Sequence, residues 1–303
     1  MAQVTIIIIN WNTKSLLAQC LDSINTHCQG FDIEVIVVDN GSQDGSQEMV
    51  SNRYPQVKLL QNEQNLGFAK ANNLAIQASS SPYVLLLNSD ALLTKGAVEA
   101  MLDLAQSQPK AGIIGARLLN VDGSFQASFT VFPSLWREFL IISGLGRLIF
   151  GRWFPSEGPQ IEKGPQIVDY VEGACLFVNR DAIQEVGGLC EDYFMYAEEV
   201  DWCMRMKQRG WQVWYHPGAE VIHYGGGSSR NRMTAREGDL YVSKVLFFKK
   251  YRSRFSSIAL QAMLLAFTTV KYAAHGVLRI VSRHRYGRKV IPPWVLFQRF
   301  WRG

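Results

Sequence analysis

The stretch SPYVLLLNSDALL, residues 81–93, places a carboxylate directly after an apolar segment. Tyr83 to Leu87 has the apolar, partly branched composition of a strand that is buried on both faces, and Asn88 and Asp90 follow closely. One interpretation is a loop and cap that lead into a helix from about Thr94. The other is that Asp90 lies at the carboxyl edge of a parallel sheet, where open α/β folds bind ligands, and holds a divalent cation.

A second acidic cluster lies in YFMYAEEVDWCMRMKQRGW, residues 193–211. Glu198 and Glu199 are flanked by aromatic residues, and an aromatic cleft around a carboxylate can tune it as a general base. The helical periodicity of this stretch places Asp201 four residues before Arg205, where an ordinary ion pair explains it slightly better than catalysis does. Asp201 is therefore a third, weaker catalytic candidate.

His223 ends the apolar run of VIHYGGGSS and precedes the glycines at 225–227, whose missing side chains permit a mobile loop or a close approach to a ligand. An imidazole is a suitable ligand for Mn²⁺ or Mg²⁺ beside Asp90. A lone histidine near a strand end is usually structural, and we interpret His216 in that way.

Segments typical of strands and of helices alternate along the first hundred residues. Strands are expected at 4–9, 34–38, 57–60 and 83–87, and helices at 14–26, 46–53 and 69–78. This alternation predicts an α/β, Rossmann-like fold with a mostly parallel central sheet flanked by helices. Polar or acidic groups follow three strands, in NWNTKS, VVDNGSQDGS and LLLNSDALL, so they should gather at one edge of the sheet. The chain has neither a GxGxxG loop after the first strand nor a GxxxxGKS loop, which excludes a nucleotide site built on a glycine-rich loop.

Six motifs follow one another in unbroken order between about residues 3 and 230. They are TIIIINWNTKSLLAQCLDSI, VVDNGSQDGS, NLGFAKANNLAI, LLLNSDALL, VEGACLFVNRDAIQEVGGLCEDYFMYAEEVDWCMRMKQRGW and VIHYGGGSS. Together they resemble the family 2 glycosyltransferases with the GT-A fold, and most closely the bacterial rhamnosyltransferase-like members. The resemblance implies a metal-dependent, inverting transfer of a sugar, such as rhamnose, from a nucleoside-diphosphate sugar to a saccharide acceptor in the synthesis of a cell-surface polysaccharide.

The resemblance also implies roles for individual residues. Asp39 would accept a hydrogen bond from the uracil or thymine imide, and Asn88 stands where the family has the first acid of its DxD motif. Asp90, at the last position of that motif, would bind Mn²⁺ or Mg²⁺ together with His223. Glu199 falls where the family's ED motif carries its general base, and the glutamate before it is the alternative. The residues implied for nucleotide-sugar binding are Ile9, Asn10, Asn12, Asp39, Asp44, Asn65, Gly67, Asn88 and Gly173.

Charge is distributed unevenly along the chain. Residues 240–303 contain 13 Lys or Arg and no Asp or Glu, although the whole chain has 31 basic and 26 acidic residues. Because these basic residues alternate with aliphatic ones, they predict contact with an anionic membrane surface rather than with nucleic acid. We therefore expect a GT-A catalytic domain at 1–239 and a basic, amphipathic, helical C-terminal region at 240–303 that brings the protein to a lipid-linked acceptor.

Lys271, His275, Arg279 and Arg283 recur every four residues in this region. The uncharged run before them is about 16 residues long, which is short of the roughly 20 needed to span a bilayer. We expect a helix that lies on the cytoplasmic leaflet, and residues 132–154 have a similar apolar and basic character. Ordinary packing on the catalytic domain is the alternative for both segments.

The five cysteines are odd in number and lack zinc-site spacing, so we expect reduced thiols. The first residues, MAQVTIIIIN, lack the basic region of a signal peptide. Both features predict a cytoplasmic protein, peripherally associated with the inner face of the membrane. Two alternatives to a glycosyltransferase stay open: a sugar-phosphate nucleotidyltransferase, which should carry a glycine-rich basic loop after the first strand, and a non-catalytic sugar-nucleotide-binding or membrane-scaffold protein.

Overall fold

Four apolar runs near the N-terminus form neighbouring parallel strands in the computed structural model, which describes residues 2–30, 32–226, 233–281 and 290–302. The strands are β1 (Val4–Asn10), β2 (Ile33–Asp39), β3 (Lys58–Gln61) and β4 (Tyr83–Asn88), and the helices between them are α1 (Lys14–His27), α2 (Ser46–Arg53) and α3 (Phe68–Gln77). β1 lies between β2 and β4, and the register pairs Asn10 with Asp39 and Ile9 with Asn88. The predicted alternation of strands and helices is confirmed in this part of the chain.

The sheet continues beyond β4 with strands of both directions. Its order is β3-β2-β1-β4-β10-β6-β11-β5, and β8 pairs with β11. β10 runs antiparallel to both β4 and β6, so the sheet is mixed rather than uniformly parallel. The further elements are β5 (Ala91–Leu93), α4 (Ala97–Ser107), β6 (Ala111–Leu119), β7 (Phe129–Thr130), η1 (Ile161–Lys163), β8 (Gln166–Ile167), β9 (Tyr170–Val171), β10 (Cys175–Asn179), α7 (Arg180–Val186), α8 (Glu198–Gln208) and β11 (Gln212–His223). β7 and β9 form a separate two-stranded sheet.

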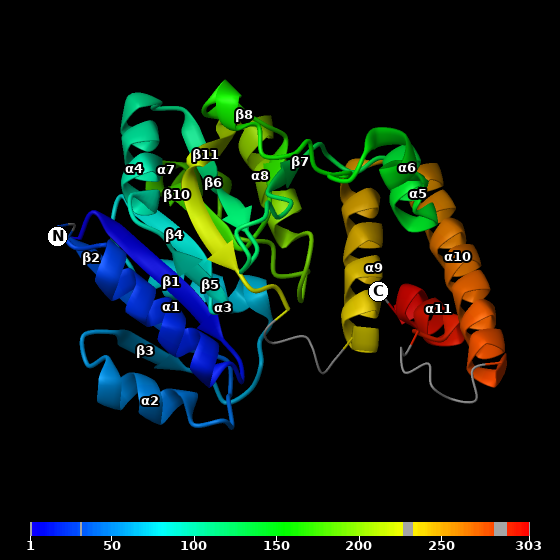
Figure 1. Ribbon diagram of the computed structural model, residues 1–303, viewed down its shortest axis with the longest axis horizontal. Helices are drawn as coiled ribbons and strands as arrows, with labels where there is room; N and C mark the ends of the chain where they lie inside the picture. The colour runs from blue at the N-terminus through cyan, green and yellow to red at the C-terminus, as the bar shows by residue number, and fades with distance from the viewer. Residues whose placement is uncertain (1, 31, 227–232, 282–289, 303) are drawn as a thin grey trace. The chain divides into compact units, whose positions relative to one another are not determined.

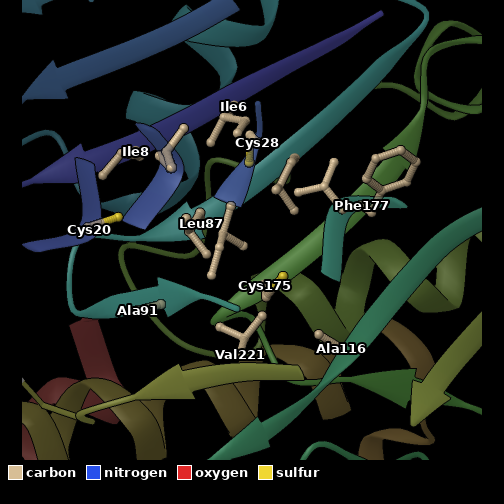
Figure 2. Close-up of a cluster of buried hydrophobic side chains, with 14 of the residues drawn as sticks. Ile6, Ile8, Cys20, Cys28, Leu87, Ala91, Ala116, Cys175, Phe177 and Val221 are labelled. Carbon is tan, nitrogen blue, oxygen red and sulfur yellow. The ribbon is translucent and has the colours of Figure 1, made fainter. Parts of the chain in front are cut away.

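Both faces of the central sheet are covered by apolar cores, and helices flank it (Figure 1). Alternate side chains of a strand point to opposite faces, so Ile6 and Ile8 of β1 join one core while Ile7 joins the other. Figure 2 shows Ile6, Ile8 and Leu87 in the first core together with Cys175. This two-sided burial explains why the runs of β1 and β4 are continuously apolar.

The five cysteines are free thiols; Cys190 is partly exposed and the other four are buried. Burial raises the pKa of Cys175 to about 12, so this side chain is a neutral part of the core.

The segment after β4 differs from the expected loop and helix. Ser89 and Asp90 form a turn, and residues 91–93 return to the sheet as β5. β5 pairs antiparallel with the end of β11 and places Ala91 opposite His223. The helix expected from about Thr94 begins at Ala97.

The chain divides into two compact units. The first comprises Met1–Phe132, Ser156–Phe194 and Glu198–Ser228, and the second comprises Pro133–Pro155, Met195–Ala197 and Ser229–Gly303. The helices of the second unit are α5 (Leu135–Ser143), α6 (Leu145–Phe150), α9 (Met233–Tyr251), α10 (Arg254–Val281) and α11 (Pro293–Arg302). The predicted division into a catalytic domain at 1–239 and a membrane-associated region at 240–303 stays a prediction.

The second unit has its own apolar core and a buried ion pair. Phe248, Leu260 and Leu296 are fully buried, and Lys244 Nζ lies 2.6 Å from Glu138 Oε2. Among the described residues, one helical stretch, Arg254–Gly276, is long and apolar enough to span a membrane by length and composition.

Of the predicted basic stripe on α10, Lys271 pairs with Glu237 at 2.6 Å. Arg283 and the side chain of Arg279 lie outside the described residues, as does Gly227 of the predicted glycine loop.

Candidate active site

The carboxyl ends of β1 and β2 are joined by buried polar side chains. Asn10 Nδ2 donates to Asp39 Oδ2 at 2.8 Å, and Thr13 Oγ1 donates to Asn10 Oδ1 at 2.6 Å. Asp39 Oδ1 accepts from the backbone N–H of Ser42 at 2.9 Å and from Gln47 Nε2 at 2.8 Å. These three donors hold the Asp39 carboxylate in place. Because a carboxylate has about four acceptor positions, Oδ2 can still accept an imide N–H.

The loop after β1 meets the loop after β2 through Asn12 and Asp44. Asn12 has a left-handed φ of 53° and accepts from the backbone N–H of Gln43 at 2.8 Å. Asp44 accepts from the backbone N–H of Lys14 at 2.8 Å. Burial acts to raise the pKa of Asp44, but hydrogen bonds from Ser46 and from backbone amides outweigh it and lower that pKa. Asn12 and Asp44 line a cavity of about 470 Å³ beside the N-terminus of α1.

Asn65 and Gly67 shape the turn that leads into α3. Gly67 N–H donates to Asn65 Oδ1 at 2.9 Å, and Asn40 Nδ2 donates to the Gly67 carbonyl at 3.2 Å. Gly67 has a φ of 84°, and a Cβ there would lie 2.6 Å from the carbonyl oxygen of Phe194. A side chain at this position would therefore displace the segment that precedes Glu198.

Asp90 and His223 are brought together by the pairing of β5 with β11. Asp90 Oδ1 lies 3.3 Å from His223 Nε2, and Asn88 Nδ2 lies 3.5 Å from the same nitrogen. The backbone N–H of Tyr224 donates to the Asp90 carbonyl at 3.0 Å. Ser89 Oγ and Thr13 Oγ1 are 2.9 Å apart, which links this turn to the cluster around Asn10.

Glu198 and Glu199 begin α8; Glu198 is buried and Glu199 is partly buried, and the setting of both favours the protonated acid. Burial raises the pKa of Glu198 to about 7. Burial, followed by the negative charges of Glu198 and Glu172, raises the pKa of Glu199 well above its usual value. The Oε2 atoms of Glu198 and Glu199 are buried and have no hydrogen-bond partner among the described residues. Strongly shifted, unpartnered carboxyl groups of this kind occur preferentially at functional sites, and their catalytic role here stays a prediction.

The glutamates follow two residues with an unusual backbone conformation, and a glycine lies beside Glu199. The two residues before them, Tyr196 and Ala197, have left-handed φ values of 72° and 64°, a conformation that costs roughly 1–3 kcal/mol for a residue other than glycine. Gly173 lies against Glu199, because a Cβ built there would be 3.7 Å from the Glu199 side chain.

Asp201 has the partners of a structural residue. Arg205 Nε donates to Asp201 Oδ2 at 2.7 Å, and Tyr193 Oη donates to Oδ1 at 3.4 Å. Arg205 also donates to the carbonyls of Val186 and Gly188. These contacts favour the ion-pair interpretation, and the catalytic role stays a prediction.

Comparison with known protein families identifies the family of this chain. Residues 5–187 match the sequence profile described as Glycosyl transferase family 2. The chain belongs to this family.

Relatives of this glycosyltransferase act on sugars. It is 30% identical over 281 residues to the N-acetylglucosaminyl-diphospho-decaprenol L-rhamnosyltransferase of Mycobacterium tuberculosis. The match covers 83% of this chain and 90% of that protein. It is 25% identical over 174 residues to the rhamnosyltransferase WbbL of Escherichia coli K12, covering 54% of this chain and 63% of that one. The predicted family is confirmed, and so is the prediction that the protein is a glycosyltransferase.

Solved structures share the fold of the glycosyltransferase. The mannosyltransferase PcManGT from Pyrobaculum calidifontis, in complex with GDP-Man and Mn²⁺, matches with a TM-score of 0.57 at 16% identity, over 98% of this chain and 79% of that one. TarS 1–349 from S. aureus matches with a TM-score of 0.53 at 14% identity, over 88% and 70%. The predicted GT-A fold is confirmed.

Several residues of the site have no motif that could have revealed them. Gln126, in the loop between β6 and β7, lies 2.6 Å from His223 through its Oε1 atom and the ring Nδ1. Gln47 of α2 donates to Asp39. The contact of Gln126 depends on how distant segments of the glycosyltransferase pack, whereas Gln47 directly follows the VVDNGSQDGS motif without being part of it.

Proposed function

We propose that this glycosyltransferase moves a sugar such as rhamnose, with inversion and with the help of a divalent cation, from a nucleoside diphosphate to a lipid-linked saccharide acceptor in cell-surface polysaccharide synthesis. The observation that carries the proposal is the approach of Asp90 Oδ1 to His223 Nε2, 3.3 Å apart at the carboxyl edge of the sheet. The 30% identical relative, whose name describes a rhamnosyltransferase with a decaprenol-linked substrate, supports the choice of donor and acceptor.

Asp90 and His223 supply ligand atoms that Mn²⁺ and Mg²⁺ accept, one carboxylate oxygen and one imidazole nitrogen. The described residues contain no group of three or more His, Cys, Asp and Glu side chains that could hold a metal ion. This donor set fits a cation that shares its remaining positions with diphosphate oxygens and water. When bound there, the cation would act as a Lewis acid on the departing diphosphate.

The chain's own groups position the donor and accept the proton. Asp39 would accept the imide N–H of uracil or thymine, and the loop containing Asn12 and Asp44 would lie near the base. Glu199, or its neighbour Glu198, in its ionised form would take the proton of the acceptor hydroxyl as that hydroxyl attacks the anomeric carbon opposite the leaving group, which inverts the anomeric configuration. Positioned base catalysis of this kind contributes typically about 10² to 10⁴ in rate.

The second unit supplies features of a membrane-associated surface. α10 buries Leu260, Leu264 and Thr268, and only 22% of its most apolar window is buried inside the protein. Because one face of α10 packs on the protein, we expect the helix to lie on the cytoplasmic leaflet rather than to span it. Large apolar side chains are exposed on α5, α6, α10 and α11: Trp136, Leu145, Leu148, Ile149, Phe150, Phe255, Ile258, Val270, Tyr272, Trp294, Phe297 and Trp301.

The test is a reaction with full-length protein, Mn²⁺, a panel of sugar nucleotides that includes dTDP-rhamnose, and a polyprenyl-diphosphate-linked N-acetylglucosamine acceptor. We expect release of nucleoside diphosphate, extension of the acceptor and, by NMR, an inverted anomeric configuration, all lost in Asp90→Ala. Formation of a nucleoside triphosphate and a sugar 1-phosphate when pyrophosphate is added to the sugar nucleotides would indicate a nucleotidyltransferase. Nucleotide binding without turnover of any donor would indicate a non-catalytic binding protein.

A further inference from the structure

We propose that Gln126 is a positioning residue for the cation site: it holds His223 in the tautomer that carries its proton on Nδ1 and so aims the lone pair of Nε2 at Asp90. The inference rests on the proposed function, because it assumes that Asp90 and His223 hold the cation. It adds a residue that lies outside every motif of the chain.

The hydrogen bonds of Gln126 determine which end of its amide faces the imidazole. Gln126 Nε2 donates to Asn120 Oδ1 at 3.0 Å and to the His223 carbonyl at 3.2 Å. Asn120 is oriented in turn, because its Nδ2 donates to Ser124 Oγ at 2.9 Å. Rotating the Gln126 amide by half a turn would place its oxygen against two acceptors, so its Oε1 must face the ring.

The tautomer of His223 follows from this orientation. Oε1 of Gln126 lies 2.6 Å from His223 Nδ1 and can only accept, so Nδ1 carries the proton. The lone pair of a neutral ring is then on Nε2, which faces the carboxylate oxygen of Asp90 at 3.3 Å. Two acceptor atoms this close together could both be ligands of one cation.

Gln126 is also held in place by its backbone. Its N–H donates to the Leu118 carbonyl at 2.8 Å, and Leu119 bridges to Phe125 in the antiparallel sense. Leu119 pairs with Ile222 of β11, the neighbour of His223. The loop that carries Gln126 and the strand that carries His223 are therefore fixed to the same strand, β6, so the amide and the ring keep their distance.

The first experiment compares the Mn²⁺ affinity of full-length variants, by electron paramagnetic resonance and calorimetry, with and without dTDP. Gln126→Leu should weaken Mn²⁺ binding by about 10- to 100-fold, as substitutions of residues that orient metal ligands typically do. Gln126→Glu keeps an acceptor for Nδ1–H and should stay within a few-fold of the unsubstituted protein. Gln106→Leu, on the exposed face of α4, is the matched control. Equal Mn²⁺ affinity of Gln126→Leu and the control would overturn the inference.

A second experiment needs no substitution of Gln126. The ¹⁵N shifts of the His223 ring, assigned by comparison with His223→Gln, should show a protonated Nδ1 in the metal-free protein. The opposite tautomer would overturn the inference even if Gln126→Leu failed to fold.

Asp90→Ala and His223→Ala separate this inference from the proposed cation site. If both weaken Mn²⁺ binding and Gln126→Leu does not, the inference about Gln126 alone is wrong. If Asp90→Ala and His223→Ala leave Mn²⁺ binding unchanged, the proposed cation site is wrong, and the role of Gln126 is rejected with it.

Discussion

The side chain of Asn10 donates a hydrogen bond of 2.8 Å to the carboxylate of Asp39, and this contact joins the carboxyl ends of β1 and β2 inside the protein. Three protein groups donate to Asp39: Asn10 Nδ2, the backbone N–H of Ser42 and Gln47 Nε2. An acceptor-only side chain therefore satisfies all three donors at this position, and the proposed binding of a base that presents an N–H would use the same property.

Asp39→Asn should weaken the binding of dTDP and UDP by about tenfold, which corresponds to about 1.4 kcal/mol. The new amide N–H₂ group would face donors, so the stability of the protein should also fall by about 1–3 kcal/mol. Calorimetry with dTDP and UDP measures the first effect and denaturant unfolding the second, with Asp103→Asn on the exposed face of α4 as the control. Unchanged affinity for both nucleotides would remove Asp39 from the base-binding site.

The second prediction concerns the general base. Glu199→Gln should lower kcat by about 10² or more with little loss of dTDP affinity, because the base acts on the acceptor in the transition state. Steady-state kinetics of Glu199→Gln and Glu198→Gln decide between the two neighbours, and Glu162→Gln, which is exposed, is the control. If only Glu198→Gln is impaired, the base is Glu198, and if neither is, the cluster is not the base.

The third prediction is a pH dependence of stability caused by Glu198. Burial raises the pKa of Glu198 from its usual 4.5 to about 7, so the folded state binds this proton more tightly than the unfolded chain does. The free energy of unfolding should therefore decrease as pH rises from about 4.5 to about 7, by up to about 3 kcal/mol. Glu198→Gln should make this decrease smaller, which denaturant unfolding at pH 5 and pH 8 would measure. An equal pH dependence in the variant and the parent would contradict the buried setting.

The fourth prediction separates structure from catalysis at Asp201. Asp201→Asn breaks a pair whose carboxylate is 1% exposed, so it should lower stability by about 3 kcal/mol. Removal of the exposed pair between Arg53 and Asp22, by Arg53→Gln, should change stability by less than about 1 kcal/mol. Thermal unfolding and kcat are measured on both variants. A large loss of kcat in Asp201→Asn without loss of stability would instead assign Asp201 a catalytic role.

The fifth prediction concerns the membrane. Trp294, Phe297 and Trp301 are 55%, 54% and 83% exposed on α11, so replacing all three by Ser should abolish sedimentation with anionic vesicles while soluble donor turnover persists. Val121→Ser, at a 62% exposed residue of the first unit, is the control. Substitution is a sharper test than truncation after Tyr251, because truncation would remove the buried Leu260 and Leu296.

Salt offers an independent check, since the attraction between basic residues and anionic lipid should weaken as the Debye length falls from about 8 Å at 0.15 M to about 3 Å at 1 M. Equal sedimentation of the triple variant and the parent protein would show that α11 does not contact lipid.

Much of the framework was predictable from the sequence by itself. The apolar runs of β1, β2 and β4 identify strands buried on both faces, and the polar residues that follow them must share an edge because the strands are parallel. Asn10 and Asp39 therefore meet as expected, and six ordered motifs were sufficient to identify the family.

Only the tertiary structure decided how the site is completed. The return of residues 91–93 to the sheet, which brings Asp90 to His223, depends on a pairing with a strand far along the chain, and a local pattern cannot specify such a pairing. The contact of Gln126 with His223 and the raised pKa of Glu198 arise in the same way. Hydrogen bonding between distant segments and burial are properties of the packed chain, whereas local sequence patterns report only the secondary structure and exposure that neighbouring residues favour.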